Sequence, residues 1–264
     1  MKKFLVTMLA LVTLGASAGE KSPSVKFEEG NFFSITSQFD RKLLDDFSEK
    51  LLGYDKKELI IYFDTPGGSV IALSSMARLM KASDVKFTCV ASFAASAGFM
   101  LFQHCDNRYL LSNGVLMSHN WSGSFSGEAP RILTLYNTIN DLVATIEAVA
   151  IEKMSVNKKE YAALINDNLW MTSRLALKYK AIDKVITKVS CSKDIIEQRV
   201  QTLQRSWGGS KFVYKSGCPL IQKTYYKVKN GRSGRFVSSS KDLFSLAQKA
   251  YKKESFNWIY MGAK

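Results

Sequence analysis

The sequence predicts an α/β fold with a mainly parallel sheet, and three observations support this prediction. Short apolar runs that are typical of buried strands alternate with segments whose apolar residues recur at helical spacing. Strands that alternate with helices favour parallel pairing through right-handed crossovers. The chain of 264 residues, 46% of them hydrophobic, is long and apolar enough for one large domain with an extension.

The expected elements follow one another in this alternating order. The first helix is expected in TSQFDRKLLDDFSEKLL (36–52), where the apolar residues Phe39, Leu43, Leu44, Phe47 and Leu51 recur at helical spacing. The expected strands are ELIIYF (58–63), VKFTCVA (85–91), NRYLLS (107–112) and GVLMSH (114–119). The remaining expected helices are SVIALSSMARLMKAS (69–83), SAGFMLFQH (96–104) and a long amphipathic helix over residues 131–153.

The first residues read as a secretory signal peptide rather than as part of the fold. Lys2 and Lys3 precede an apolar run that ends in Ala16-Ser17-Ala18, a small-residue cleavage site. A membrane anchor is the alternative, but the run of about a dozen apolar residues is shorter than the roughly 20 that span a bilayer. We therefore expect residues 1–18 to be removed and the protein to be exported, periplasmic or secreted.

Charge marks a boundary near the carboxyl end of the chain. The formal net charge is +14, of which residues 201–264 carry +11, from 13 Lys and Arg against 2 Asp and Glu. We expect a body over residues 19–190 and a basic extension over residues 191–264, with a hairpin at Asn230-Gly231 and a basic helix over residues 240–253. The extension is either a solvated appendage or a contact for an anionic membrane surface, and nucleic acid is the least favoured partner.

The four cysteines, Cys89, Cys105, Cys191 and Cys218, allow three sets of pairings. Export favours disulfides, and a Cys191–Cys218 bond would close a loop at the start of the basic extension. Cys89 and Cys105 could pair if the helix after Ser96 folds back along the preceding strand. The spacings match no zinc pattern, and we expect no metal and no cofactor.

One serine, Ser96, lies among the smallest residues in the sequence Ala94-Ala95-Ser96-Ala97-Gly98. Small residues serve either close packing or a catalytic turn whose backbone a substrate can approach. Ser96 follows an expected strand and opens an expected helix, where free N–H groups favour negative charge. Pro66-Gly67-Gly68 has the same placement, although such a sequence is often only a turn. Together the two turns could place two N–H donors around one oxyanion.

A serine nucleophile needs a base, and the chain has only two histidines. His104 lies two turns into the helix after Ser96, where a structural role is favoured. His119 ends an expected strand and begins the glycine-rich loop NWSGSFSGEA, which is a suitable place for a base.

The segments around Gly68, Ser96 and His119 resemble those of a known family. TPGGSV, ASFAASAGFML, GVLMSHNWSGSFSGEAPRI and WMTSRLALKYKAIDKVI resemble successive blocks of the Clp protease proteolytic subunit, ClpP, a crotonase-like serine peptidase, in the same order. The resemblance runs from about residue 29 to residue 189. It implies a fold of repeated β-β-α units, followed here by the basic extension. Signal peptide peptidase A shares the serine and glycine blocks but uses a lysine base, so His119 favours the ClpP side.

The resemblance also implies roles for individual residues. Ser96 corresponds to the nucleophile, His119 to the general base and acid, and the N–H groups of Gly68 and Ala97 to the oxyanion hole. The family's third residue is an aspartate two positions before an aromatic residue, and here that position holds Asn168. Asparagine can orient the imidazole but lacks the charge that stabilises imidazolium. Asp167 is the alternative third residue.

The resemblance implies a serine endopeptidase that acts on peptides or flexible and unfolded protein segments. Because the signal peptide predicts export to a compartment without ATP, we expect the protein to act without ATP. Family members in the cytosol receive substrates from a ring ATPase, a partnership that is doubtful for an exported protein. They also form homo-oligomers, which pair through a handle that corresponds here to the segment from Ser122 through the long helix. The alternative function is a non-catalytic ClpP-like binding or assembly protein, since the third residue departs from the family pattern.

Overall fold

A six-stranded, mainly parallel sheet forms the centre of the protein, as predicted. The structure, a computed structural model, describes residues 23–197, 199–206, 209–221 and 224–227. The strand order is β2-β3-β4-β5-β6, with β7 also paired to β5, and β5–β6 is the antiparallel pair in this sheet. The bounds are β2 (Phe32–Ile35), β3 (Glu58–Thr65), β4 (Lys86–Ala95), β5 (Asn107–Ser118), β6 (Leu169–Thr172) and β7 (Lys184–Ile186).

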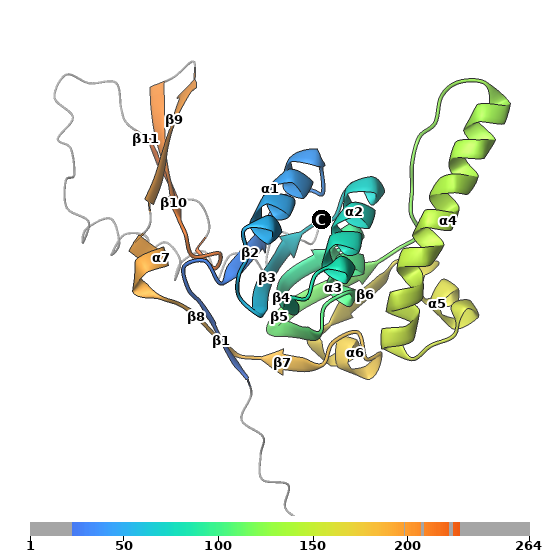
Figure 1. Cartoon of the computed structure of the whole chain (residues 1–264), viewed down its shortest axis with the longest axis horizontal. Helices are drawn as coiled ribbons and strands as arrows, with labels where there is room; N and C mark the ends of the chain where they lie inside the picture. Colours follow the sequence, from blue (N-terminus) through green and yellow to red (C-terminus); the bar gives the residue numbers. More distant parts are fainter. Residues whose placement is uncertain (1–22, 198, 207–208, 222–223, 228–264) are drawn as a thin grey trace, which may run out of the picture.

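Helices cover one face of this sheet and enclose the main core (Figure 1). Ile61 and Phe63 of β3 point into that core, whereas Tyr62 between them points to the opposite face, as the period of two in a strand requires. The long helix α4 begins away from the sheet and runs back to the core, which it contacts through Ile146, Ala150 and Met154 near its carboxyl end (Figure 1). The helices are α1 (Arg41–Leu52), α2 (Val70–Ala82), α3 (Ala97–Gln103), α4 (Ala129–Met154), α5 (Lys158–Ile165), α6 (Ser173–Lys178) and α7 (Lys193–Glu197).

The strand expected at residues 85–91 continues to Ala95 in β4, and two further expected elements also differ from the structure. The first helix begins at Arg41, because the Asp40 side chain accepts the Leu43 N–H at 2.8 Å and caps the helix there. Phe39 therefore precedes the helix, and its N–H donates to the Gly67 carbonyl at 2.8 Å. The strands expected at residues 107–112 and 114–119 form one continuous strand, β5, that runs through Gly114.

A smaller two-stranded sheet lies against the opposite face of the main sheet. It pairs β1 (Ser24–Phe27) in parallel with β8 (Lys188–Cys191), which joins the two ends of the expected body. Buried side chains between this small sheet and the main sheet form a second core, which we call the outer cluster. It contains Val25, Phe27, Tyr62, Val90, Ile186, Ile195 and Cys218. Ile195 and Cys218 belong to the expected extension, so its first residues pack onto the body. The boundary at residue 190 lies inside β8 and stays a prediction.

The described part of the extension contains a three-stranded antiparallel sheet with the order β11-β10-β9. Its strands are β9 (Arg199–Ser206), β10 (Gly209–Ser216) and β11 (Thr224–Lys227). The expected signal peptide (1–18), the expected hairpin at Asn230-Gly231 and the expected helix over residues 240–253 lie outside the described residues. Among the helices that the structure describes, none has the length and apolar character needed to cross a bilayer.

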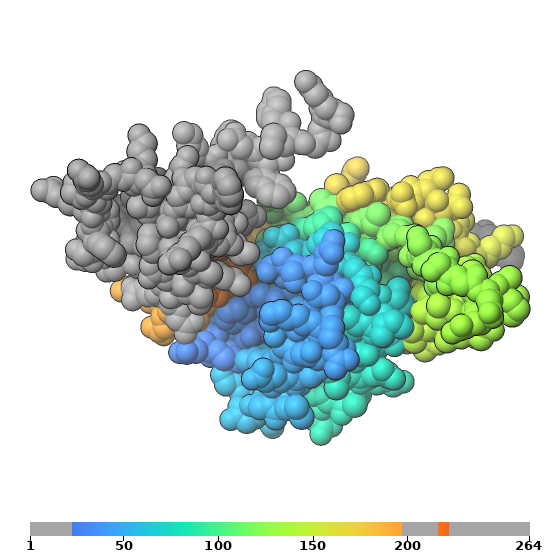
Figure 2. Space-filling view, turned by 90° about the horizontal axis from the view of Figure 1, so that it is seen from above, coloured from blue at the N-terminus to red at the C-terminus, as the bar shows by residue number. Residues whose placement is uncertain are grey.

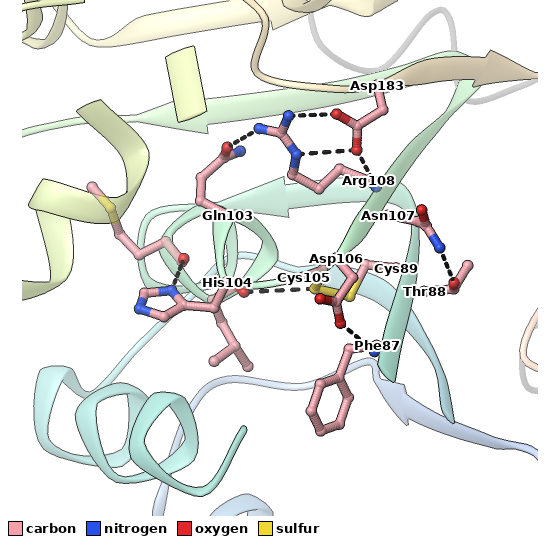
Figure 3. The surroundings of a disulfide bond; sticks show 12 residues. Phe87, Thr88, Cys89, Gln103, His104, Cys105, Asp106, Asn107, Arg108 and Asp183 are labelled. Atoms are coloured by element: carbon pink, nitrogen blue, oxygen red, sulfur yellow. Dashed lines mark hydrogen bonds and ion pairs between the residues drawn. A yellow bond between two sulfur atoms is a disulfide. The ribbon is translucent and has the colours of Figure 1, made fainter. Parts of the chain in front are cut away.

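All four cysteines are paired, as Cys89–Cys105 and Cys191–Cys218. Cys89 lies inside β4 and Cys105 follows α3, so this bond ties the strand before Ser96 to the end of the helix after it (Figure 3). Beside it, Arg108 is buried between the Asp183 carboxylate and the Gln103 side chain (Figure 3). Cys191 ends β8 and Cys218 follows β10, so the second bond fixes the base of the extension.

We expect the double variant Cys89→Ala/Cys105→Ala to lower the free energy of unfolding by about 3 kcal/mol. The bond spans 16 residues, and closing a loop of that size restricts the unfolded chain by about this amount. Denaturant titration of the oxidised protein measures the effect. Cys191→Ala/Cys218→Ala is the matched control, which keeps the bond beside Ser96. Equal stability of the wild type and the Cys89/Cys105 variant would contradict the stabilising role.

Candidate active site

Ser96 lies on a sharp turn between β4 and α3. Its φ of 55° and ψ of −121° are rare for a residue other than glycine. The turn is held on both sides, because the Ser96 N–H donates to the Met117 carbonyl at 2.9 Å and the Ser96 carbonyl accepts the Met100 N–H at 3.1 Å. The side chain makes no capping hydrogen bond to its own helix. Its hydroxyl is therefore directed at other groups.

His119 is the group that this hydroxyl meets. His119 follows the last residue of β5, and its Nε2 lies 2.8 Å from Ser96 Oγ. The neighbouring parallel strands β4 and β5 thus deliver a serine and a histidine to one edge of the sheet, as expected for a strand-end site. A histidine at this distance can accept the hydroxyl proton and later return it.

The turn Pro66-Gly67-Gly68, called the glycine turn, packs directly against the serine turn Ala95-Ser96-Ala97. A Cβ atom on Gly67 would lie 2.7 Å from Ser96 Cβ, 2.6 Å from the Ala95 carbonyl oxygen and 2.8 Å from the Ala97 nitrogen. Conversely, a Cβ atom on Gly98 would lie 2.6 Å from the Thr65 methyl group. The small residues around Ser96 therefore serve close packing, and this packing brings the two turns together.

Two backbone donors lie beside Ser96 as a result. Gly68 and Ala97 line one small pocket together with Ser96 and His119. Among the described residues, no carbonyl or side-chain oxygen accepts the N–H of Gly68 or of Ala97. Ala97 is the first residue of α3, where the N–H groups lack partners within the helix. The pocket thus offers two free donors to a negatively charged oxygen.

Among the described residues, neither candidate third residue forms a hydrogen bond with His119. Asn168 is exposed in the left-handed conformation (φ 61°), and its N–H donates to the Ile165 carbonyl. Asp167 accepts a hydrogen bond from the Asn166 side chain at 3.3 Å. Within the described part of the chain, His119 Nδ1 has no hydrogen-bond partner. The choice between Asn168 and Asp167 therefore stays open.

A buried pair of hydroxyl groups supports the end of β5. Ser118, directly before His119, shares a hydrogen bond of 2.9 Å with the Tyr161 hydroxyl of α5. Burial raises the pKa of Tyr161 above its ordinary value, so the phenol stays protonated and available as a donor. The sequence did not predict this pair, because Tyr161 looks like any other residue on the apolar face of a helix. The pair fixes the backbone from which His119 projects.

A groove of about 700 Å³ continues from the small pocket between the loop after His119 and α4. The loop is attached to the helix by Trp121, whose Nε1 donates to Asn140 Oδ1 at 2.8 Å. Rings of Trp121, Phe125 and Tyr136 pack together beside it. In Figure 2, α4 lies to the right of α1 and α2, at the side of the molecule away from the extension. The groove shares Trp121, Val143 and Glu147 with the small pocket that contains Ser96, and its size is sufficient for an extended peptide.

His104, the other histidine, lies at the far end of α3, away from Ser96. Its Nδ1 contacts the Met100 carbonyl at 2.9 Å, and burial lowers the pKa of its imidazole (Figure 3). These contacts agree with the structural role expected from the sequence. The half-buried Glu147 of α4, by contrast, lines both the small pocket and the groove. The sequence analysis missed Glu147, since nothing in its helix pattern separates it from other polar positions.

Comparisons with known proteins identify relatives of this chain. The family profile described as Clp protease matches residues 25–189. An ATP-dependent Clp protease proteolytic subunit from Borreliella afzelii is 29% identical over 135 residues, which cover 50% of this chain and 68% of that protein. Subunit 1 of Borreliella burgdorferi is likewise 29% identical over 135 residues, with 50% and 70% coverage.

A solved structure supports the fold. An asparagine-to-aspartate mutant of ClpP1 from Listeria monocytogenes matches with a TM-score of 0.54 and 19% sequence identity. The match covers 62% of this chain and 94% of that chain. At this identity the match shows the fold alone, and it agrees with the ClpP-like, mainly parallel architecture expected from the sequence.

Proposed function

The chain belongs to the Clp protease family and is thus a peptidase, and we propose that it is an exported serine endopeptidase that uses Ser96 as its nucleophile. The observation that supports this most strongly is the distance of 2.8 Å between Ser96 Oγ and His119 Nε2, in a small pocket that adjoins the groove. Its substrates are peptides or flexible and unfolded protein segments, which can enter the groove in an extended conformation.

The proposed mechanism uses the two turns together. Ser96 Oγ attacks the peptide carbonyl while His119 Nε2 takes its proton. The N–H groups of Gly68 and Ala97 donate to the oxyanion of the tetrahedral intermediate. His119 then protonates the leaving amine, and an acyl group remains on Ser96. Water attacks this ester with His119 again as the base, which releases the second product and restores Ser96.

A fluorophosphonate probe tests the serine assignment directly, because it reacts with an activated serine hydroxyl. We expect the wild-type protein to be labelled at Ser96 and the label to be found by mass spectrometry of the digested chain. The alternative function is a ClpP-like binding or assembly protein without catalysis. Absence of labelling in protein that binds peptides would favour that alternative and remove the peptidase mechanism from this site.

Asn168 is the proposed third residue, and its effect should be smaller than that of the nucleophile or base. An asparagine orients the imidazole without supplying charge, so we expect Asn168→Ala to lower kcat/KM by less than about 10⁴-fold. We expect Asn168→Asp to preserve or raise activity. Steady-state hydrolysis of a fluorogenic peptide measures both variants. Activity that is lost in Asp167→Ala but kept in Asn168→Ala would transfer the role to Asp167.

Two features support export to a periplasmic or extracellular compartment. Residues 1–18 have the pattern of a signal peptide, and both cysteine pairs are disulfides, which persist in oxidising compartments. Such compartments lack the ATP that a ring ATPase partner needs, so we propose activity without ATP. As in the family, we propose a homo-oligomer that pairs through the segment from Ser122 through α4. Binding of the basic extension to an anionic membrane surface also stays a proposal.

A further inference from the structure

Glu147 is a half-buried carboxylate without a partner beside the candidate nucleophile. It lies on α4 and lines the same small pocket as Ser96 and His119. Among the described residues, Glu147 accepts no hydrogen bond and lies within 4.0 Å of no cationic nitrogen. Burial raises the pKa of its carboxyl group, and the positive charge of Lys158 opposes this shift. A carboxylate that is partly removed from water and unpaired is costly unless a ligand compensates it.

The remainder of the small pocket is apolar. Its side walls come from three helices, α2, α3 and α4, which contribute Val70, Leu73, Met100, Val143 and Ile146. Leu73, Met100 and Ile146 are buried, so these walls are held in place by the main core. The free N–H groups of Gly68 and Ala97 line the same pocket. A substrate whose carbonyl meets these donors would therefore place the adjacent side chain against the apolar walls.

A pocket with apolar walls and one carboxylate residue in its lining matches a particular kind of side chain. Lysine and arginine have an apolar stem and a cationic end, so the stem can pack while the end meets a carboxylate. The charged side chains along the groove are Asp141, Glu147 and Lys158, which leaves one negative charge in excess. Trp121, which lines both the pocket and the groove, adds an aromatic face that attracts cations.

We propose that Glu147 selects substrates in which a lysine or an arginine supplies the scissile carbonyl. This inference rests on the proposed peptidase function, since it assigns a specificity to the same site. Glu147 binds the cationic end of the side chain and takes no part in the proton transfers between Ser96 and His119.

The test compares three fluorogenic peptides that differ only in the residue before the scissile bond, which is lysine, norleucine or glutamate. Norleucine keeps the apolar stem of lysine without its charge. We expect the full-length oxidised protein to prefer lysine over norleucine by about tenfold or more in kcat/KM. Glu147→Gln should bring this ratio close to one, and Glu147→Lys should shift the preference to glutamate. Glu152→Gln is the matched control, since it neutralises an exposed carboxylate of the same helix that lines neither the groove nor the small pocket.

A binding measurement separates this inference from the proposed function. In the Ser96→Ala background, fluorescence anisotropy reports the affinity for the lysine and norleucine peptides without turnover. A lysine preference that disappears with Glu147→Gln supports the inference even if the wild type cleaves neither peptide, a result that would overturn the peptidase function alone. Active protein whose lysine-to-norleucine ratio is unchanged by both Glu147 variants would overturn the inference and leave the peptidase function standing.

Discussion

Ser96→Ala should lower kcat/KM for peptide hydrolysis by about 10⁴-fold or more and abolish fluorophosphonate labelling. The hydroxyl is the group that would form the acyl bond, and its only described partner is His119 Nε2 at 2.8 Å. His119→Ala should be nearly as damaging, because an unassisted serine hydroxyl barely ionises near neutral pH. The double variant should be little worse than either single variant, since nucleophile and base act as a unit.

His104→Asn is the matched control for the histidine, because it changes the only other histidine of the chain. The asparagine amide can replace the contact that His104 Nδ1 makes with the Met100 carbonyl. Peptide hydrolysis and probe labelling in this variant should stay within about threefold of the wild type, since His104 lies away from Ser96. Full activity in Ser96→Ala would remove the nucleophile assignment, and additive losses in the double variant would contradict a shared mechanism.

Gly67→Ala should reduce acylation of Ser96 by about 100-fold or more, although residue 67 itself carries no reacting group. The added methyl group would meet all three residues of the serine turn at distances of 2.6 to 2.8 Å, and two of the contacted atoms belong to the backbone. The turn must therefore shift, which displaces Ser96 Oγ from His119 and the Ala97 N–H from the oxyanion position. Losing one oxyanion donor alone costs about 10²- to 10³-fold.

Gly30→Ala separates this clash from backbone strain. Gly67 and Gly30 both have positive φ angles, of 95° and 77°, so alanine is strained at either position. At Gly30, however, the nearest atom to the added methyl group is the flexible end of Lys56 at 3.8 Å. We expect both variants to lose stability, by about 1–2 kcal/mol from the backbone angle, and only Gly67→Ala to lose labelling. Equal labelling rates in the two variants would contradict the steric argument.

Much of the fold was predictable because its pattern is local. The buried residues of β3 and β4 form short apolar runs, and the apolar residues of α2 and α4 recur at helical spacing, so each element was visible in its own sequence. The start of α1 was not, because the apolar spacing continues upstream to Phe39 while the Asp40 cap ends the helix. Phe39 is buried through a contact with the distant Gly67-Gly68 turn, which helical spacing cannot reveal.

The candidate site was predictable where its residues follow strands. Ser96 and His119 each come after a buried strand, and the parallel pairing of β4 with β5 brings two such positions together. Glu147 and Tyr161 were not predictable, because they reach the site from helices whose rotation about their axes depends on packing. The third residue of the site was also not predictable. A shift of one residue in the alignment with the family's aspartate replaces Asn168 by Asp167.

The pairing of β1 with β8 has a consequence for how this chain reaches its folded state. The partners Ser24 and Lys188 are separated by 164 positions, from 24 to 188, and contacts between such distant segments form slowly. During synthesis from the amino end, β1 cannot form this pair until β8 has been made. Phe27 therefore lacks its partner strand while β2 to β7 are already present in the chain. The pairing of β1 with β8 is thus a late step of folding, after the strands of the main sheet have become available.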